Sequence, residues 1–317
     1  MGRPKFYTFW RNAPALEGGH LDEPALPPQP AARQRGPRIA LSLILFCYAC
    51  ARILEVVSSP VPRTAIVALD VLSAMAFALT DGARHYRVRG ILIFACICIA
   101  VGNLVENIGV TTGFPFGRYY FVELMGPKLF HVPVLLGLAY IGMAYVSWMV
   151  ARLIQGRSEA PPAGAGLFTL PLLASAIMTA WDLAQDPVWA TVLHGWVWRD
   201  GGPWFGVPVS NYLGWYGTVF TIYLLFALYL RRRPALPLAA DRGSWLPALL
   251  FYGLCAAGNA LQTVPQAVPA VVQDPTGKLW RVAHITAASA LVSIFLMGGF
   301  VVLGWARLPR QRKGSRD

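Results

Sequence analysis

The chain has 317 residues, of which 56% are hydrophobic and 13% are charged, and its mean hydropathy is +0.50. This composition excludes an ordinary soluble domain and is typical of a membrane protein with several spans. The formal net charge of +12 would suit a nucleic-acid partner only if the basic residues gathered on one surface.

The predicted elements begin with a polar arm, residues 1–37, whose Pro, Gly and charge content predicts a disordered cytoplasmic segment. Eight apolar stretches follow, each long enough to cross a hydrocarbon core of about 30 Å. They cover residues 38–58, 63–81, 90–112, 131–153, 167–193, 211–230, 245–266 and 280–305. The chain ends in a basic tail, 307–317. The predicted fold is therefore an all-α, polytopic membrane helical bundle with one transmembrane domain, residues 38–306.

The basic residues follow the predicted topology. With a cytoplasmic N-terminus, 20 of the 27 Lys and Arg residues fall on the inside, six fall on the outside, and Arg52 lies within a span. This is the positive-inside pattern, so we expect a multi-pass protein of the cell membrane with both termini in the cytoplasm. The basic excess is then explained by topology and lipid headgroups, and no nucleic-acid partner is expected.

Two of the outer loops, residues 113–130 and 194–210, are dense in Gly, Pro and aromatic residues. A loop that only joins two spans does not require so many rings. We expect both loops to fold as structured caps over the outer end of the bundle.

Ionisable side chains interrupt the apolar stretches at six positions. They are Arg52, Glu55, Asp70, Glu106, Asp182 and Asp186. A charge in hydrocarbon costs about 2.5–3.5 kcal/mol on insertion scales, so such residues normally face a protein interior or a wet cavity. With a rise of about 1.5 Å per helical residue, all six fall in the outer half of the membrane. The sequence thus predicts one buried polar chamber near the outer face and an inner half with almost nothing polar.

Three of the carboxyls are candidates for chemistry. Glu106 shares a helix face with Asn103 and Asn107, and Asp182 lies one turn from Asp186. A carboxyl that is buried without a cation can keep the proton that a general acid needs. We therefore assign Glu106, Asp182 and Asp186 as catalytic, and the division into acid and base stays open.

A purely structural role is the alternative for buried charges, because Arg52 can neutralise a carboxylate and the others can lock helices together. We assign this supporting role to Arg52, Glu55 and Asp70. One arginine cannot neutralise all five carboxyls, which leaves some of them needing another explanation.

No metal or cofactor is assigned. His131, His194 and His284 are the histidines placed near the outer chamber, and a zinc ion held by all three stays an open alternative. The sequence contains no Gly-rich phosphate loop, nucleophile elbow or dinucleotide fingerprint.

Aromatic residues concentrate beside the outer carboxyls, whereas an interfacial belt would be spread over both membrane faces. Such rings suit a large apolar ligand or a stabilised cation. The predicted substrate-binding residues are Asn103, Asn107, Phe114, Phe116, Tyr119, Tyr120, Trp181, Trp196, Trp204, Asn211 and Trp215.

Two stretches carry a family resemblance. One is Glu106-Asn107 followed by the segment TGFPFGRYY at 112–120. The other is DLAQDP at 182–187 followed by WVW at 196–198, FGVP at 205–208 and NYLGW at 211–215. Through roughly residues 40–305, the chain resembles the membrane-bound carotenoid biosynthesis proteins that include the CruF-type carotenoid 1,2-hydratases.

The resemblance implies addition of water to the terminal 1,2 double bond of an acyclic carotenoid end, which gives a tertiary alcohol. Lycopene, gamma-carotene or a bacterioruberin-type precursor is the implied substrate, with water as the second reactant and other carotenoid enzymes as conceivable partners. Acid–base catalysis by Glu106, Asp182 and Asp186 would need no redox cofactor.

Two other functions stay open at this point. A transporter or lipid-binding protein would use buried carboxylates as a proton relay, and it would place polar residues through the full depth of the membrane. The apolar inner half predicted from the sequence argues against it. A non-catalytic partner in a carotenoid enzyme complex is the third possibility.

Overall fold

The computed structural model describes residues 31–57, 60–156, 161–232, 242–264 and 268–309. Most of the predicted N-terminal arm and most of the basic tail lie outside these residues. The first helix begins at Ala31, earlier than the predicted start at residue 38.

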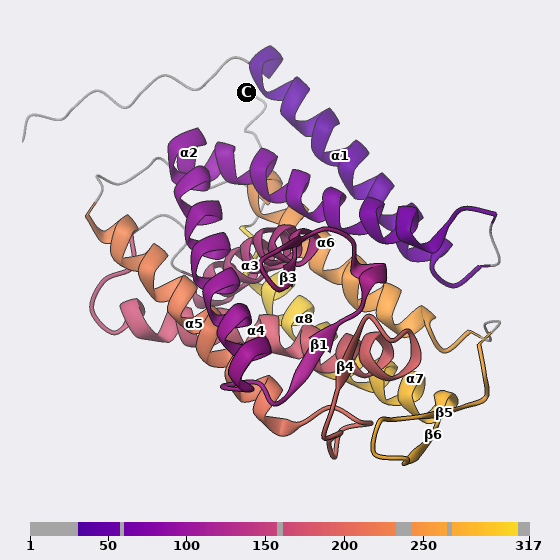
Figure 1. Cartoon of the computed structure of the whole chain (residues 1–317). Helices are drawn as coiled ribbons and strands as arrows, with labels where there is room; N and C mark the ends of the chain where they lie inside the picture. The colour runs from indigo at the N-terminus through magenta and orange to yellow at the C-terminus, as the bar shows by residue number, and fades with distance from the viewer. Residues whose placement is uncertain (1–30, 58–59, 157–160, 233–241, 265–267, 310–317) are drawn as a thin grey trace, which may run out of the picture. The chain divides into compact units, whose positions relative to one another are not determined.

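The described chain is a bundle of long helices (Figure 1). They are α1 (Ala31–Leu54), α2 (Arg63–Thr112), α3 (Val134–Gln155), α4 (Gly166–Pro187), α5 (Val209–Arg231), α6 (Arg242–Leu261), α7 (Val282–Leu291) and α8 (Gly298–Arg307). A π-helical turn, η2 (Val188–Val192), extends α4, and a second one, η3 (Val292–Met297), joins α7 to α8. Seven of the resulting helical rods are long and apolar enough to cross a membrane, which confirms the predicted all-α polytopic bundle.

The longest helix, α2, contains two of the predicted spans. Its 50 residues are interrupted at Arg87, where φ is 57° and ψ is 166°, a conformation that residues other than glycine rarely adopt. The arms 63–86 and 88–112 run in different directions from this corner (Figure 1). The spans predicted at 63–81 and 90–112 are therefore present, but a corner replaces the expected loop between them.

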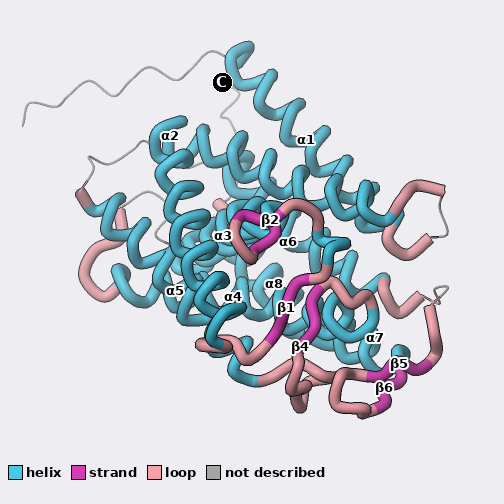
Figure 2. Tube along the Cα trace, viewed as in Figure 1, coloured by secondary structure: helices cyan, strands magenta, loops and turns pink. Residues whose placement is uncertain are grey.

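Short strands occur in the connections (Figure 2). β1 (Tyr119–Phe121) pairs antiparallel with β4 (Trp196–Trp198), so Tyr119 lies opposite Trp198. The hairpin of β2 (Lys128–Leu129) and β3 (Val132–Pro133) follows a 3-10 turn, η1 (Glu123–Met125), and β5 (Val271–Gln273) pairs with β6 (Leu279–Arg281). The two aromatic loops are thus ordered and joined to each other, as predicted for structured caps.

The β5–β6 hairpin is organised around Asp274, which is 6% exposed. Its carboxylate accepts hydrogen bonds from Thr276 Oγ1 at 2.6 Å and from Trp280 Nε1 at 2.8 Å. Burial raises the pKa of Asp274, but the hydrogen bonds from Thr276 and Trp280 outweigh that effect and hold the pKa below its usual range.

Every second connection between helices lies on the same side of the bundle. On the side of the strands, Phe205 from the second aromatic loop packs on Trp280 with ring centroids 5.4 Å apart. On the side of the α2 corner, Arg152 at the end of α3 donates to Tyr86 at 3.2 Å, and His85 packs on Trp245 near the start of α6 at 5.5 Å. The helices therefore alternate in direction, as the predicted topology requires.

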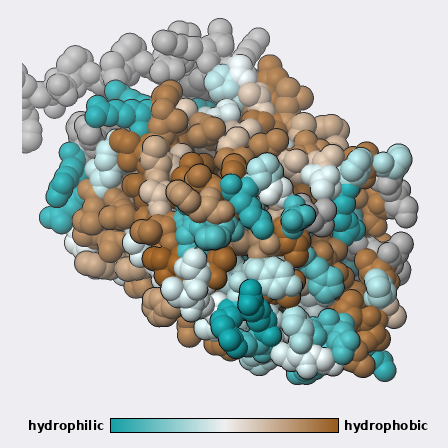
Figure 3. All heavy atoms as spheres, viewed as in Figure 1, coloured by the Kyte–Doolittle hydropathy of each residue, from teal (hydrophilic) through white to brown (hydrophobic). Residues whose placement is uncertain are grey.

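α3 lies in the middle of the bundle, and its residues from Tyr140 to Leu153 are buried. Large apolar side chains such as Phe46, Leu104 and Phe295 are instead exposed on the outside, and apolar residues cover much of the surface (Figure 3). An apolar exterior of this extent is what a lipid environment accommodates.

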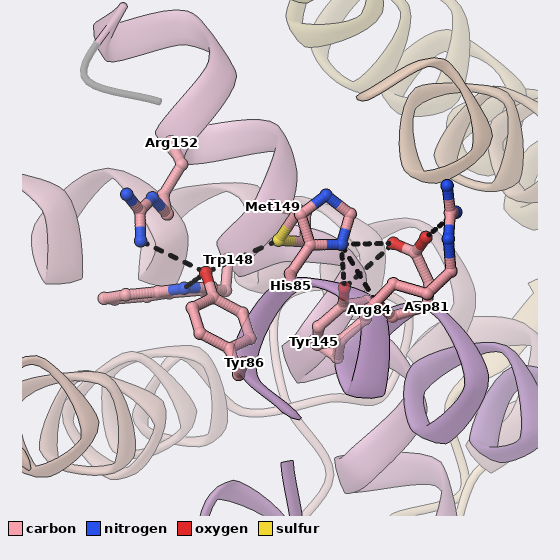
Figure 4. Close-up of polar contacts among 8 residues, drawn as sticks. All are labelled: Asp81, Arg84, His85, Tyr86, Tyr145, Trp148, Met149 and Arg152. Carbon is pink, nitrogen blue, oxygen red and sulfur yellow. Dashed lines mark hydrogen bonds and ion pairs between the residues drawn. The ribbon is translucent and has the colours of Figure 1, made fainter. Parts of the chain in front are cut away.

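A buried polar network lies at the α2 corner (Figure 4). Asp81, which is fully buried, accepts hydrogen bonds from Tyr145 at 2.8 Å and from Arg84 at 2.9 Å, and its carboxylate lies 3.4 Å from His85 Nδ1. The prediction that the inner half holds almost nothing polar is therefore wrong. The first arm of α2 continues past residue 81, so residues assigned to a basic loop are drawn into the bundle.

Candidate functional site

Three carboxyls from two helices meet at one small cavity. Glu106 comes from the second arm of α2, and Asp182 and Asp186 come from successive turns at the end of α4. All three line a cavity of about 40 Å³, and their exposed fractions are 2%, 3% and 1%. The helix-face pattern in the sequence thus corresponds to a shared site.

Glu106 is held by two tyrosine hydroxyls. Tyr140 donates to Oε1 at 2.8 Å, and Tyr119 donates to Oε2. The ring of Tyr140 stacks on Trp215 with centroids 4.6 Å apart and an interplanar angle of 9°. Burial, followed by the charge of Glu106, raises the pKa of Tyr119, so its hydroxyl keeps its proton and acts as a donor.

The aspartates share one amide donor. Asn211, in the first turn of α5, donates through Nδ2 to Asp186 Oδ2 at 2.7 Å and to Asp182 Oδ2 at 3.3 Å. Trp196 Nε1 donates to the other oxygen of Asp186 at 2.7 Å. Asp186 is therefore bonded at both oxygens, whereas within the described chain Asp182 receives only the longer bond from Asn211.

The hydrogen-bond donors of this site are neutral in the part of the chain that the structure describes. Among the described residues, no Lys, Arg or His forms an ion pair with Glu106, Asp182 or Asp186. Their hydrogen-bond donors are phenols, an amide and an indole, all of them neutral. Carboxyls in such surroundings can exchange a proton with a ligand without breaking a salt bridge.

The remaining charged residues of the predicted chamber form a separate network. Arg52 Nη1 lies 2.8 Å from Glu55 and 3.6 Å from Asp70, and Nη2 donates to Asn259 at 2.7 Å. Gly258 permits this packing, because a Cβ there would collide with the Arg52 side chain. The prediction of one chamber holding all six charges is therefore wrong. The position of a residue along a helix determines its depth in the membrane, but it does not determine which neighbouring helix its side chain faces.

The predicted substrate-binding residues divide into two groups. Those that line the carboxyl cavity are Phe116, Tyr119, Trp181, Trp196, Asn211 and Trp215. Those that lie elsewhere are Asn103, Asn107, Phe114, Tyr120 and Trp204. The first group supplies aromatic walls around the carboxyls.

The second group has other contacts. Phe114 and Tyr120 are 75% and 42% exposed. Asn107 accepts a hydrogen bond from the backbone of His131 at 3.0 Å, which fixes the β2–β3 hairpin to α2. Trp204 donates to the carbonyl of Leu183 at 3.1 Å, so it ties its loop to α4.

Sequence reasoning missed several residues of the site. Phe121, Leu136 and Gln185 also line the cavity, together with Trp198 of the WVW segment, and Tyr140 bonds Glu106. Phe121 could have been found, because alternate residues of a strand share a face and Tyr119 was already assigned. Tyr140 had no such signal, since α3 carries a second buried tyrosine, Tyr145, that does not reach the site.

The three histidines considered for zinc do not come together with other ligands. His131, His194 and His284 are each exposed. Within the described ranges, no three His, Cys, Asp or Glu residues form a group that could hold a metal ion.

Two larger cavities adjoin the site. One has a volume of about 410 Å³ and the other about 230 Å³, and Arg63, Val67, Trp189 and Leu193 line both. Trp189 stacks on Trp196 with centroids 6.1 Å apart and an interplanar angle of 3°. Since Trp196 lines the carboxyl cavity, this pair of indoles stands between the small acidic cavity and the large ones.

Comparison with known proteins identifies the family. A profile of carotenoid biosynthesis proteins matches residues 64–274. The chain is also similar to the bisanhydrobacterioruberin hydratase of Haloarcula japonica, with 29% identity over 123 residues that cover 38% of this chain and 40% of that protein. No solved structure matches. Because the family match covers about two thirds of the chain and includes all three carboxyls, this protein belongs to the carotenoid biosynthesis protein family.

Proposed function

We propose that this protein adds water to the terminal 1,2 double bond of an acyclic carotenoid end and forms a tertiary alcohol. Lycopene, gamma-carotene and bacterioruberin-type precursors carry such an end. The observation that supports the proposal best is the cavity where Glu106, Asp182 and Asp186 meet among aromatic rings, with no cation paired to them among the described residues. The name of the Haloarcula japonica relative, a hydratase, supports the same class of reaction.

Asp182 is the proposed acid. It lies one turn from Asp186, and two carboxylates so close together without a cation favour sharing a proton. The hydrogen bond that Asp182 accepts from Asn211 is the longer of the two, 3.3 Å. Hydrogen bonds therefore stabilise the ionised form of Asp182 less than that of Asp186, and we assign the shared proton to Asp182. The π electrons of the double bond take this proton at C2, and the positive charge is left on the tertiary carbon C1.

Aromatic faces stabilise the cation. Trp181 and Trp215 line the cavity, and an indole face contributes about 0.5–2 kcal/mol to binding a cation. A volume of about 40 Å³ has room for a few water molecules, each of which needs roughly 10–15 Å³. One water supplies the lone pair that forms the C–O bond at C1.

Glu106 is the proposed base. Tyr119 and Tyr140 donate hydrogen bonds to both of its oxygens, and a carboxylate is the form that accepts at both. It takes the proton released when water bonds to C1. Transfer of that proton to Asp182 through cavity water restores the starting state, so the reaction consumes only the alkene and one water.

The deciding experiment is product analysis in labelled water with purified protein and lycopene. The wild type is expected to place deuterium on C2 and oxygen from water on C1. Asp182→Asn should form no alcohol and incorporate no deuterium. Glu106→Gln should still allow protonation, so deuterium should enter recovered or isomerised alkene while alcohol formation falls by about 10²–10⁴-fold.

Other results would refute the proposal. Oxygen derived from dioxygen would indicate a hydroxylase. Full hydration activity in both Asp182→Asn and Glu106→Gln would show that Asp182 is not the acid and that Glu106 is not the base.

A proton-relay function is the second candidate, and the network of Asp81, His85 and Tyr145 favours it because it places ionisable groups in the inner half of the bundle as well. A transporter reconstituted in liposomes would change the internal pH when a proton gradient is applied. A hydratase would leave that pH unchanged and form product.

For the orientation, we propose that the strand-bearing loops face the outside of the cell membrane and that the α2 corner faces the cytoplasm, as the distribution of basic residues suggests. Membrane-impermeant thiol reagents should label Arg199→Cys in intact cells and Arg89→Cys only after lysis. The reverse pattern would invert the topology.

A further inference from the structure

The two large cavities have a defined ligand chemistry. Val67 and Leu193 belong to both, and most of the other residues around them are apolar. The larger volume, about 410 Å³, falls within the roughly 300–1,000 Å³ typical of small-molecule sites. An elongated hydrocarbon fits such walls better than a polar metabolite does.

The charged residue inside the larger cavity does not call for a charged ligand. Glu55 lines this cavity, but its carboxylate is paired with Arg52 at 2.8 Å. Arg63, the basic residue of both cavities, is exposed and can be solvated at the rim. Neither the paired Glu55 nor the solvated Arg63 requires a charged ligand, which favours a neutral occupant.

The large cavities lie beside the carboxyl cavity, and this position indicates which neutral ligand they bind. The Trp189 ring faces the large cavities, and its stacked partner Trp196 bonds Asp186 and lines the acidic one. A substrate whose end reacts at the carboxyls must place the rest of its chain in adjoining space. The large cavities begin one aromatic layer away.

We propose that these two cavities bind the polyene chain of an acyclic carotenoid and that Trp189 is a positioning residue at the passage to the carboxyls. The inference rests on the proposed function for the identity of the ligand. Trp189 touches the chain, and through Trp196 it sets how far the reactive end reaches toward Asp186.

The test uses binding without turnover. Lycopene is added to the full-length Asp182→Asn protein in lipid nanodiscs, and circular dichroism in the visible range is recorded, because an achiral polyene gains a signal only in a chiral site. Ala283→Trp fills the larger cavity from α7, and Val67→Trp fills both cavities from α2. Leu291→Trp is the matched control, since Leu291 is also on α7, is 57% exposed and lies outside the lining of these cavities.

The induced signal is expected in Asp182→Asn and in its combination with Leu291→Trp. Both filling variants should weaken lycopene binding at least tenfold, about 1.4 kcal/mol, while their thermal unfolding midpoints stay close to that of the control. Equal binding in the filled and control proteins would overturn the inference, even if the wild type forms alcohol. Binding that the filling variants abolish, combined with no hydration by the wild type, would support the site and refute the proposed reaction.

Trp189 is tested in the active protein. Trp189→Ala should raise KM for lycopene about tenfold and reduce alcohol formation, and Trp189→Phe should restore much of both. A short acyclic alkene with the same terminal group has no polyene chain to place in the large cavities, so its conversion should be affected less. An equal loss for the long and the short substrate would assign Trp189 a merely structural role.

Discussion

Replacing Tyr140 by Phe tests whether the tyrosine hydroxyls at Glu106 serve the reaction. The hydroxyl donates to Glu106 Oε1 at 2.8 Å, and both residues are only 2% exposed. Phenylalanine retains the ring that stacks on Trp215, so the substitution removes one hydrogen bond and little packing.

The magnitude follows from the charge of the acceptor. A hydrogen bond to a charged group contributes about 1.5–3 kcal/mol, which corresponds to roughly 10- to 100-fold in rate if the bond is needed in the transition state. Because Tyr119 still donates to the other oxygen of Glu106, Tyr140→Phe should reduce turnover without abolishing it. KM should change little, since the hydroxyl does not face the large cavities.

The chain offers a matched control on the same helix. Tyr145 is also buried and donates to Asp81 at 2.8 Å, but this bond belongs to the network at the α2 corner (Figure 4). Tyr145→Phe should lower the thermal unfolding midpoint and leave the turnover of folded protein unchanged. Unchanged turnover in Tyr140→Phe, or an equal loss in both variants, would refute the proposed role of the hydroxyl.

Three further predictions concern other parts of the bundle. Arg52→Met leaves two buried carboxylates without their cation and should cost about 3–5 kcal/mol of stability, measured as a lower unfolding midpoint in detergent. Gly214→Ala places a Cβ 2.7 Å from the Phe116 ring and should reduce turnover by displacing this wall of the carboxyl cavity, although no polar group of the site changes. The pKa of Asp274 is lower in the folded than in the unfolded state. Its contribution to the stability of the β5–β6 hairpin is therefore complete above the unfolded pKa of about 3.9. That contribution is lost as the pH falls through the folded pKa. Pepsin should therefore cut this hairpin at pH 2 more readily than at pH 4, whereas Asp274→Asn should be cut at both.

The sequence alone determined the membrane class and the order of the apolar helices along the chain. A helix surrounded by lipid must be apolar over about 20 residues, and this requirement is local, so it can be read without knowing any neighbour. The same is true of the acidic turn that holds Asp182 and Asp186, because residues four apart on a helix share a face. The aromatic loops were also recognisable, since their composition departs from that of a simple connection.

Only the tertiary structure decided which buried charges meet. The sequence placed Asp70 and Glu106 at a similar depth, but Asp70 pairs with Arg52 whereas Glu106 joins Asp182 and Asp186. The corner at Arg87 likewise brought Asp81 into the bundle. Depth follows from the number of residues along a helix, whereas the partner of a side chain depends on how each helix is rotated and which helix lies beside it. Those quantities are set by packing between segments that are distant in the chain.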